Sequence, residues 1–239
     1  MPAPLRARFQ ALLDSHVQDL LRCEEIQAIE RGRATREEID RFIEGVIRSH
    51  LRSPKLLAFV YALAPPGEAT KNLLHNMLEE LGLDADEGGV AHPDLLIFLA
   101  RGAGLESRLP TLEAEADEEL RRYVVDPLLH GTLRDVGLSA LAEIVAFEYM
   151  LSRVSSRIAR ALGVHRGLSS DALQWFTHHA EVDLAHAEQG LDEVVHFAAH
   201  YGLSDDDAMT LLEMALRENV FVKRYFGAEA LARLRGLST

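Results

Sequence analysis

Apolar side chains recur along most of this chain at the three- and four-residue spacing of amphipathic helices. The alternation of apolar and polar residues that is typical of β-strands is nearly absent from the sequence. We therefore expect an all-α fold. The predicted helices follow one another through short connections, so residues 1–239 are expected to form one bundle-like domain of seven or eight helices.

Capping and helix-breaking residues set the expected boundaries. Thr35 and Glu38 have the spacing of a capping box at the start of the second helix, and Pro54 should bend or divide that helix. Gly163 and Gly202 are expected to end the two longest helices. The predicted helices span about 5–31, 35–64, 68–82, 92–104, 110–130, 133–163 and 169–201, and a last helix begins near 204.

Composition narrows the class of protein. The net charge is −13, and the acidic residues are spread along the chain, which argues against a nucleic-acid partner. No apolar run approaches the length of a membrane span, so no membrane role is expected. The one cysteine, Cys23, lies among apolar residues and fits a small core residue in a reducing cytoplasm. We expect a cytoplasmic protein.

The most informative motif lies in the seventh predicted helix. His179, Asp183 and His186 stand at i, i+4 and i+7 and therefore share one helical face. Burying these groups without partners would be unfavourable, and a metal ion would resolve that cost. Imidazole and carboxylate together suit iron, manganese or zinc. His178 is rotated about 100° from this face and is expected to be an ordinary surface or packing residue.

Other candidate ligands remain ambiguous on pattern alone. Glu143 and Glu148 both lie in an apolar stretch of the preceding helix, and their five-residue spacing means that they cannot face the same point. In the first half of the chain the candidates are Glu68 with His75, Glu79 or Glu80, and His92. Each of these residues is equally compatible with a solvated side chain.

Several of these motifs resemble a known family. The sequence from His179 to His186, preceded by Trp175-Phe176, resembles the last metal-binding helix of the heme-oxygenase-like diiron oxidases. Their superfamily also includes thiaminase-II-like proteins and pyrroloquinoline-quinone synthase. Three further segments resemble family elements, namely the helix end 76–82, the His-Pro element 92–96 with the turn 104–105, and the aromatic-Glu pair 147–149.

The resemblance implies a heme-oxygenase-like helical bundle with two irons that cycle between Fe(II) and Fe(III). It implies six metal ligands, which are Glu80, His92, Glu148, His179, Asp183 and His186. Glu79 stays an alternative to Glu80. Some family members add a carboxylate from an earlier helix, but residues 50–59 contain none here. Either the six ligands suffice, or His50 or Glu44 substitutes, or one iron site is weak and a single metal binds.

The implied activity is the oxidation of a small amine- or acid-bearing molecule with O2 as co-substrate. The resemblance also implies a homodimer. Two alternatives remain open, namely a metal-free enzyme like thiaminase II or pyrroloquinoline-quinone synthase and a non-catalytic small-molecule-binding protein. A thiaminase-II-like enzyme needs a nucleophilic cysteine, for which Cys23 is the one candidate. A heme oxygenase needs an early axial histidine, for which His16 is the candidate.

Overall fold

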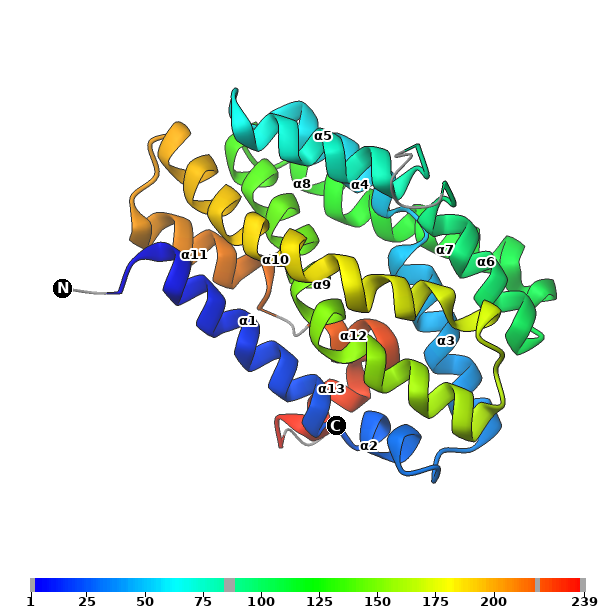
Figure 1. Cartoon of the computed structure of the whole chain (residues 1–239). Coiled ribbons are helices and arrows are strands. Elements are labelled where there is room, and N and C mark those ends of the chain that lie inside the picture. Colours follow the sequence, from blue (N-terminus) through cyan, green and yellow to red (C-terminus); the bar gives the residue numbers. More distant parts are fainter. Residues whose placement is uncertain (1–2, 84–88, 218–219, 237–239) are drawn as a thin grey trace.

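The computed structural model describes residues 3–83, 89–217 and 220–236 of the chain. Every regular element in these ranges is helical and none is a strand, which confirms the predicted all-α class (Figure 1). The expected loop at 83–91 falls partly outside the described residues, because 84–88 are not among them. None of the described helices combines the length and the apolar content that crossing a bilayer requires.

The first half of the chain contains α1 Leu5–Arg22, α2 Glu24–Glu30, α3 Arg36–His50, α4 Ser53–Leu63, α5 Glu68–Glu80 and α6 His92–Ala103. The second half contains α7 Leu109–Leu120, α8 Asp126–Leu128, α9 Leu133–Ala161, α10 Gln174–His200, α11 Asp205–Ala215, α12 Val220–Phe226 and α13 Ala228–Leu234. Four single turns of 3₁₀ or π geometry lie between them, at Glu106–Arg108, Arg121–Val125, Leu162–Arg166 and Asp171–Leu173.

Two local predictions are confirmed. The Thr35 side chain accepts a hydrogen bond from the Glu38 backbone, and the Glu38 carboxylate accepts one from the Thr35 backbone, so the capping box is complete. Pro54 divides the second predicted helix, because it lies in the first turn of α4, where its missing N–H is tolerated.

Three boundary predictions are wrong. The first predicted helix divides at Cys23, whose backbone is extended with φ −63° and ψ 144°. Helix α9 does not end at Gly163, because a π turn continues it to Arg166 and Gly167 ends it in the left-handed region. The helix after Ser204 is not the last, since α12 and α13 follow it. The described residues contain more helices than the seven or eight expected, because the chain divides at Cys23, at Pro54 and at Arg121–Val125 and because α12 and α13 follow α11.

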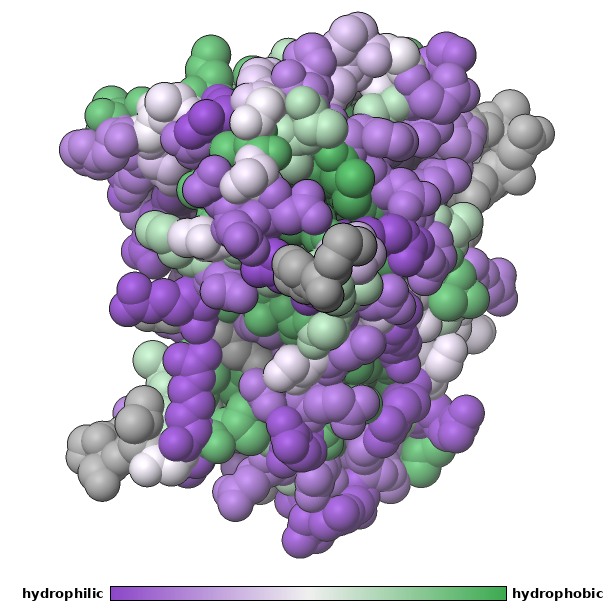
Figure 2. Space-filling view, turned by 90° about the vertical axis from the view of Figure 1, so that its left-hand side faces the viewer, coloured by the Kyte–Doolittle hydropathy of each residue, from purple (hydrophilic) through white to green (hydrophobic). Residues whose placement is uncertain are grey.

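Helices α9 and α10 run side by side through the middle of the molecule and form its largest helix–helix interface (Figure 1). Their backbones approach closely at Gly190, where a Cβ would lie 2.7 Å from Cγ2 of Val145. One turn along α9 from Val145 lies Glu148, so this close approach brings Glu148 toward the Asp183 region of α10. The outer surface is mostly hydrophilic on the face that Figure 2 shows.

Candidate metal centre

Acidic and histidine side chains converge between α5, α6, α9 and α10. Glu80, His92 and His179 each offer one ligand atom, and these three atoms lie within 4.8 Å of one another. The residues come from the end of α5, the start of α6 and the first third of α10. Two imidazoles and a carboxylate at this separation form a set of donors that a transition-metal ion can bridge.

Hydrogen bonds fix the orientation of Glu80. Its Oε1 lies 2.8 Å from Nδ1 of His92, and its Oε2 accepts a hydrogen bond of 2.6 Å from the Ser53 hydroxyl. Burial by itself would raise the pKa of Glu80, but His92, His179 and Ser53 together lower that pKa to about 2. Glu80 is therefore a carboxylate at neutral pH, which is the form that binds metal.

The backbone sets the tautomer of His179. Its Nδ1 lies 2.6 Å from the carbonyl oxygen of Trp175, and because a carbonyl only accepts, Nδ1 carries the proton. Burial, and then the neighbouring His92, hold the pKa of His179 well below its usual value. His179 is thus a neutral imidazole with a lone pair on Nε2, the arrangement that metal-binding histidines adopt.

A second group of ionisable side chains lies beside the first. His186 Nε2 lies 2.8 Å from Oε2 of Glu79, and His186 Nδ1 lies 3.9 Å from Oδ1 of Asp183. Glu148 accepts a hydrogen bond of 2.5 Å from Asn76. Burial raises the pKa of Glu148, while the charge of His186 acts in the opposite direction.

The donor set suits metal ions. Glu79 and Asp183 are both buried, Glu80 is nearly so, and Glu148 is half-buried beside them. Carboxylates gathered in a protein interior repel one another, and bound cations relieve that repulsion. Neutral imidazoles and carboxylates in one cluster are donors that divalent iron accepts. The residues present therefore fit a metal centre.

The predicted ligands lie near one another in the structure, whereas most of the alternative ligands lie elsewhere. Glu80, Glu148, His179 and Asp183 border one small cavity. His92 contacts Glu80, whereas His186 contacts Glu79, which is not among the described residues that border this cavity. The alternatives lie in different places. Glu143 pairs with Arg224, Glu44 pairs with Arg108, and Glu68 pairs with Lys71 at the surface. His50 does border the same cavity, and its Nε2 lies 2.6 Å from the Tyr225 hydroxyl.

Sequence reasoning assigned no role to His178 or Glu193 and named Glu79 only as an alternative to Glu80. His178 packs edge to face against His92, and the Nε2 atoms of the two rings lie 2.9 Å apart. Glu79 does not simply replace Glu80, since each contacts a different histidine. Glu193 is buried, and burial and the charge of Glu148 raise its pKa to about 8. The available signal was spacing, because Glu193 stands seven residues after His186 on the same helical face.

Cys23 and His16 do not fit the roles that the alternative enzymes need. Burial raises the pKa of the Cys23 thiol to about 12, so this thiol stays protonated at neutral pH. His16 is a buried residue of α1 whose charged neighbours are Asp19 and Arg235. Neither residue is among those that border the cavity of the metal centre in the described part of the chain.

An all-α bundle with buried carboxylates and histidines between its central helices defines a helical protein with a metal-binding donor set. The pattern that defines the iron-containing redox enzyme family matches residues 40–218, which is most of the chain. The chain belongs to this family of iron-containing redox enzymes and is an oxidoreductase.

Two curated proteins are similar over a comparable region. The 4-aminobenzoate synthase of Chlamydia trachomatis is 25% identical over 186 residues, which cover 77% of this chain and 74% of the relative. The 4-aminobenzoate synthase of Chlamydia muridarum is 26% identical over 186 residues, which cover 77% of this chain and 72% of the relative.

Proposed function

We propose that this protein is a non-heme diiron oxidase that uses O2 to oxidise a small amine- or acid-bearing molecule. The observation that carries the proposal is the convergence of Glu80, His92 and His179 within 4.8 Å, beside a second group that contains Asp183 and His186. Two adjacent groups of carboxylate and imidazole donors match two metal ions better than one. The family description supports iron as the metal.

The proposed ligands are Glu80, His92, Glu148, His179, Asp183 and His186. Glu148 borders the same small cavity as Glu80, His179 and Asp183, which supports its place in the proposed ligand set. Glu79 pairs with His186 in the present arrangement and is the first candidate for an additional ligand.

Residues around the ligands hold them in place. Ser53 orients Glu80, Asn76 orients Glu148, and the Trp175 carbonyl fixes the ring of His179. The cavity beside them has a volume of about 20 Å³, which holds about one water molecule. Its walls include Leu57, Ile144, Phe147, Leu151 and Trp175, which exclude bulk water. Two irons bound here would supply the electrons for reduction of O2.

The substrate class follows from the relatives and from the site. Both relatives are 4-aminobenzoate synthases, whose named product carries an amino group and a carboxylate. We extend to this chain only the class of small amine- or acid-bearing molecules. His50 is the polar residue best placed to contact such a molecule, because it borders the cavity and burial lowers its pKa to about 3, so its ring is neutral.

Metal analysis and oxygen uptake test the proposal together. Protein produced with added iron should contain about two irons per chain, as implied by the two donor groups. His179→Ala and Asp183→Ala should each lose iron, whereas His200→Ala, at an exposed site near the end of α10, should keep it. Oxygen uptake should rise when a panel of amines and carboxylic acids is added.

Two results would count against the proposal. A protein that takes up no iron but binds small molecules would be a metal-free enzyme or a binding protein. A protein that holds iron but never consumes O2 faster with any compound of the panel would not be an oxidase of this class. Zinc in place of iron would direct the assay to anaerobic reconstitution with Fe(II), since imidazole sites bind zinc readily.

We also propose that residues 1–239 form one domain, that the protein is cytoplasmic and that it is a homodimer. Support for the location is the single cysteine, which is buried and reduced. Support for the dimer is general, since two-fold homodimers are the commonest oligomers of soluble proteins. Light scattering coupled to size-exclusion chromatography measures the mass directly, and a monomer mass would refute the dimer.

A further inference from the structure

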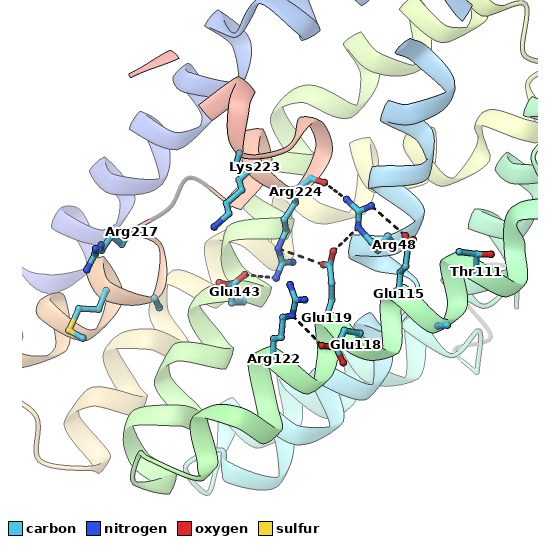
Figure 3. Close-up of a pocket in the computed structure, with 14 residues that line it drawn as sticks. Arg48, Thr111, Glu115, Glu118, Glu119, Arg122, Glu143, Arg217, Lys223 and Arg224 are labelled. Carbon is cyan, nitrogen blue, oxygen red and sulfur yellow. Dashed lines mark hydrogen bonds and ion pairs between the residues drawn. The ribbon is translucent and has the colours of Figure 1, made fainter. Parts of the chain in front are cut away.

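A large cavity lies away from the metal ligands, between α3, α7, α9, α11 and α12. Its volume is about 890 Å³, which is within the range of small-molecule sites (Figure 3). Five basic and four acidic residues border it, together with small and apolar ones such as Ala114, Met214 and Ala228. In a chain of net charge −13, this balance of basic and acidic groups is a local feature. It suits a ligand with both charges.

A buried acid and a buried base meet at the inner wall of this cavity. Glu143 is 4% exposed and Arg224 is 7% exposed. Arg224 Nη2 lies 3.6 Å from Oε2 of Glu143, and Arg224 Nε lies 4.0 Å from Oε2 of Glu119. Both contacts are ion pairs. Within the described residues, Glu143 Oε2 has no hydrogen-bond donor, which is unusual for a buried carboxylate oxygen.

The cavity leads toward the metal centre. Arg48, Glu119 and Arg224 border both this cavity and a smaller one behind it. Ser53 and Phe147 border both that smaller cavity and the one at the metal ligands. The guanidinium of Arg224 covers the Phe147 ring at 4.9 Å, and that ring packs against His50. The Arg224 and Phe147 side chains therefore separate the large cavity from the metal centre.

We propose that the large cavity binds an α-amino acid, whose carboxylate is held by Arg224 and whose ammonium group is held by Glu143. In this arrangement the ammonium group donates a hydrogen bond to the Glu143 oxygen that has no donor among the described residues. The separation of 3.6 Å between Arg224 and Glu143 matches the close spacing of the ammonium and carboxylate groups on one α-carbon.

Other residues of the cavity fit this ligand. Arg122 and Lys223 extend into the same space as Glu143 and add positive charge near the carboxylate (Figure 3). The remaining volume far exceeds an amino-acid head group and leaves room for a side chain beside Ala114, Met214 and Ala228. Burial raises the pKa of Glu143 to about 8, and an ammonium group beside it would favour the ionised form.

The ligand's role as a substrate rests on the function proposed above. An amino acid in the large cavity would lie one layer of side chains from the metal ligands, beyond Arg224 and Phe147. Displacement of the Arg224 guanidinium toward the ligand carboxylate would uncover the Phe147 ring and open the way inward. The proposed binding site itself does not require that the metal centre be active.

Titration calorimetry tests the site. It measures the binding of each of the twenty common L-amino acids to the iron-free chain and to the iron-loaded chain. At least one amino acid should bind at millimolar concentration or below, and its N-acetyl and carboxamide derivatives should bind about tenfold or more weakly, since each lacks one charged contact. In Glu143→Gln the preference for the free amine over the N-acetyl derivative should disappear. In Arg224→Gln the preference for the carboxylate over the amide should disappear.

Two tryptophan variants, one inside the cavity and one beside it, separate loss of binding from misfolding. Ala114→Trp places an indole in the mouth of the cavity at an exposed position and should abolish binding. Glu113→Trp adds the same ring to the adjacent exposed position, which does not border the cavity, and should bind as the wild type does. Binding of no amino acid, or equal binding by both tryptophan variants, would overturn the proposal.

The outcomes for the site and for the oxidase are distinct. Amino-acid binding that Ala114→Trp abolishes, without any oxygen uptake, supports the site and counts against the oxidase. Oxygen uptake with other amines or acids, without amino-acid binding, supports the oxidase and overturns the site. Oxygen uptake that rises with the bound amino acid and falls in Ala114→Trp supports both.

Discussion

Replacement of Gly45 by alanine tests how tightly α12 is held against α3. A Cβ at Gly45 would lie 2.8 Å from the carbonyl oxygen of Tyr225 and 2.9 Å from its Cα. Both are backbone atoms, so no side-chain rotation relieves the contact. Overpacking costs about 1–3 kcal/mol, and a backbone clash belongs at the upper end of that range. Alanine recovers about 1 kcal/mol of helix propensity relative to glycine.

The net effect of Gly45→Ala is a loss of about 2 kcal/mol in the free energy of unfolding. For a chain of this length that loss lowers the melting temperature by about 4–8 °C. Displacement of α12 should also weaken the contact between Tyr225 and His50, which is 2.6 Å long in the wild type. Scanning calorimetry and urea unfolding measure the change in stability.

Gly163→Ala is the matched control. A Cβ there would lie 3.4 Å from Leu173 Cδ1, an ordinary contact with a flexible side chain, and φ is not positive. This variant should be as stable as the wild type or slightly more stable, because alanine favours helical backbone. If Gly45→Ala melts at or above the wild-type temperature while Gly163→Ala does the same, the close approach of α3 and α12 is wrong.

Three further predictions concern the ionisable groups. Fe(II) at about a hundred times its dissociation constant should stabilise the protein by about 2.7 kcal/mol and thereby raise its melting temperature. This rise should vanish in His179→Ala but persist in His200→Ala. A rise that survives His179→Ala would place the metal elsewhere. Burial raises the pKa of Glu143 from 4.5 to about 8. Between pH 4.5 and about pH 8 the folded state therefore holds a proton on Glu143 that the unfolded state has lost. Glu143 consequently makes the stability of the wild type fall as the pH rises through this range. Urea unfolding should show that Glu143→Gln gains stability relative to the wild type across this range, and a constant difference would refute the shift. Burial raises the pKa of the Cys23 thiol to about 12, so this thiol should react with iodoacetamide far more slowly in the native protein than in urea. Cys23→Ser should keep its oxygen uptake. Loss of activity in this variant would support a mechanism that uses the cysteine.

Local patterns in the sequence determined the helices and the faces that carry chemistry. The capping box at Thr35, the division at Pro54 and the shared face of His179, Asp183 and His186 all depend on contacts within a few residues. Such contacts are readable from spacing. The resemblance to the iron-containing redox enzymes also rested on short motifs, and the family match confirmed it. The ligand set as a whole stays a prediction.

Only the tertiary structure decided which neighbour each buried group meets. Glu143 and Glu148 occupy the same apolar stretch, yet five residues of helix turn them about 140° apart. Helix α9 is buried on nearly all sides, so burial alone could not separate them. Glu148 meets Asn76 of α5 near the metal centre, whereas Glu143 meets Arg224 of α12 at the large cavity. Periodicity gives the direction in which a side chain points, but the packing of distant helices decides what it finds there.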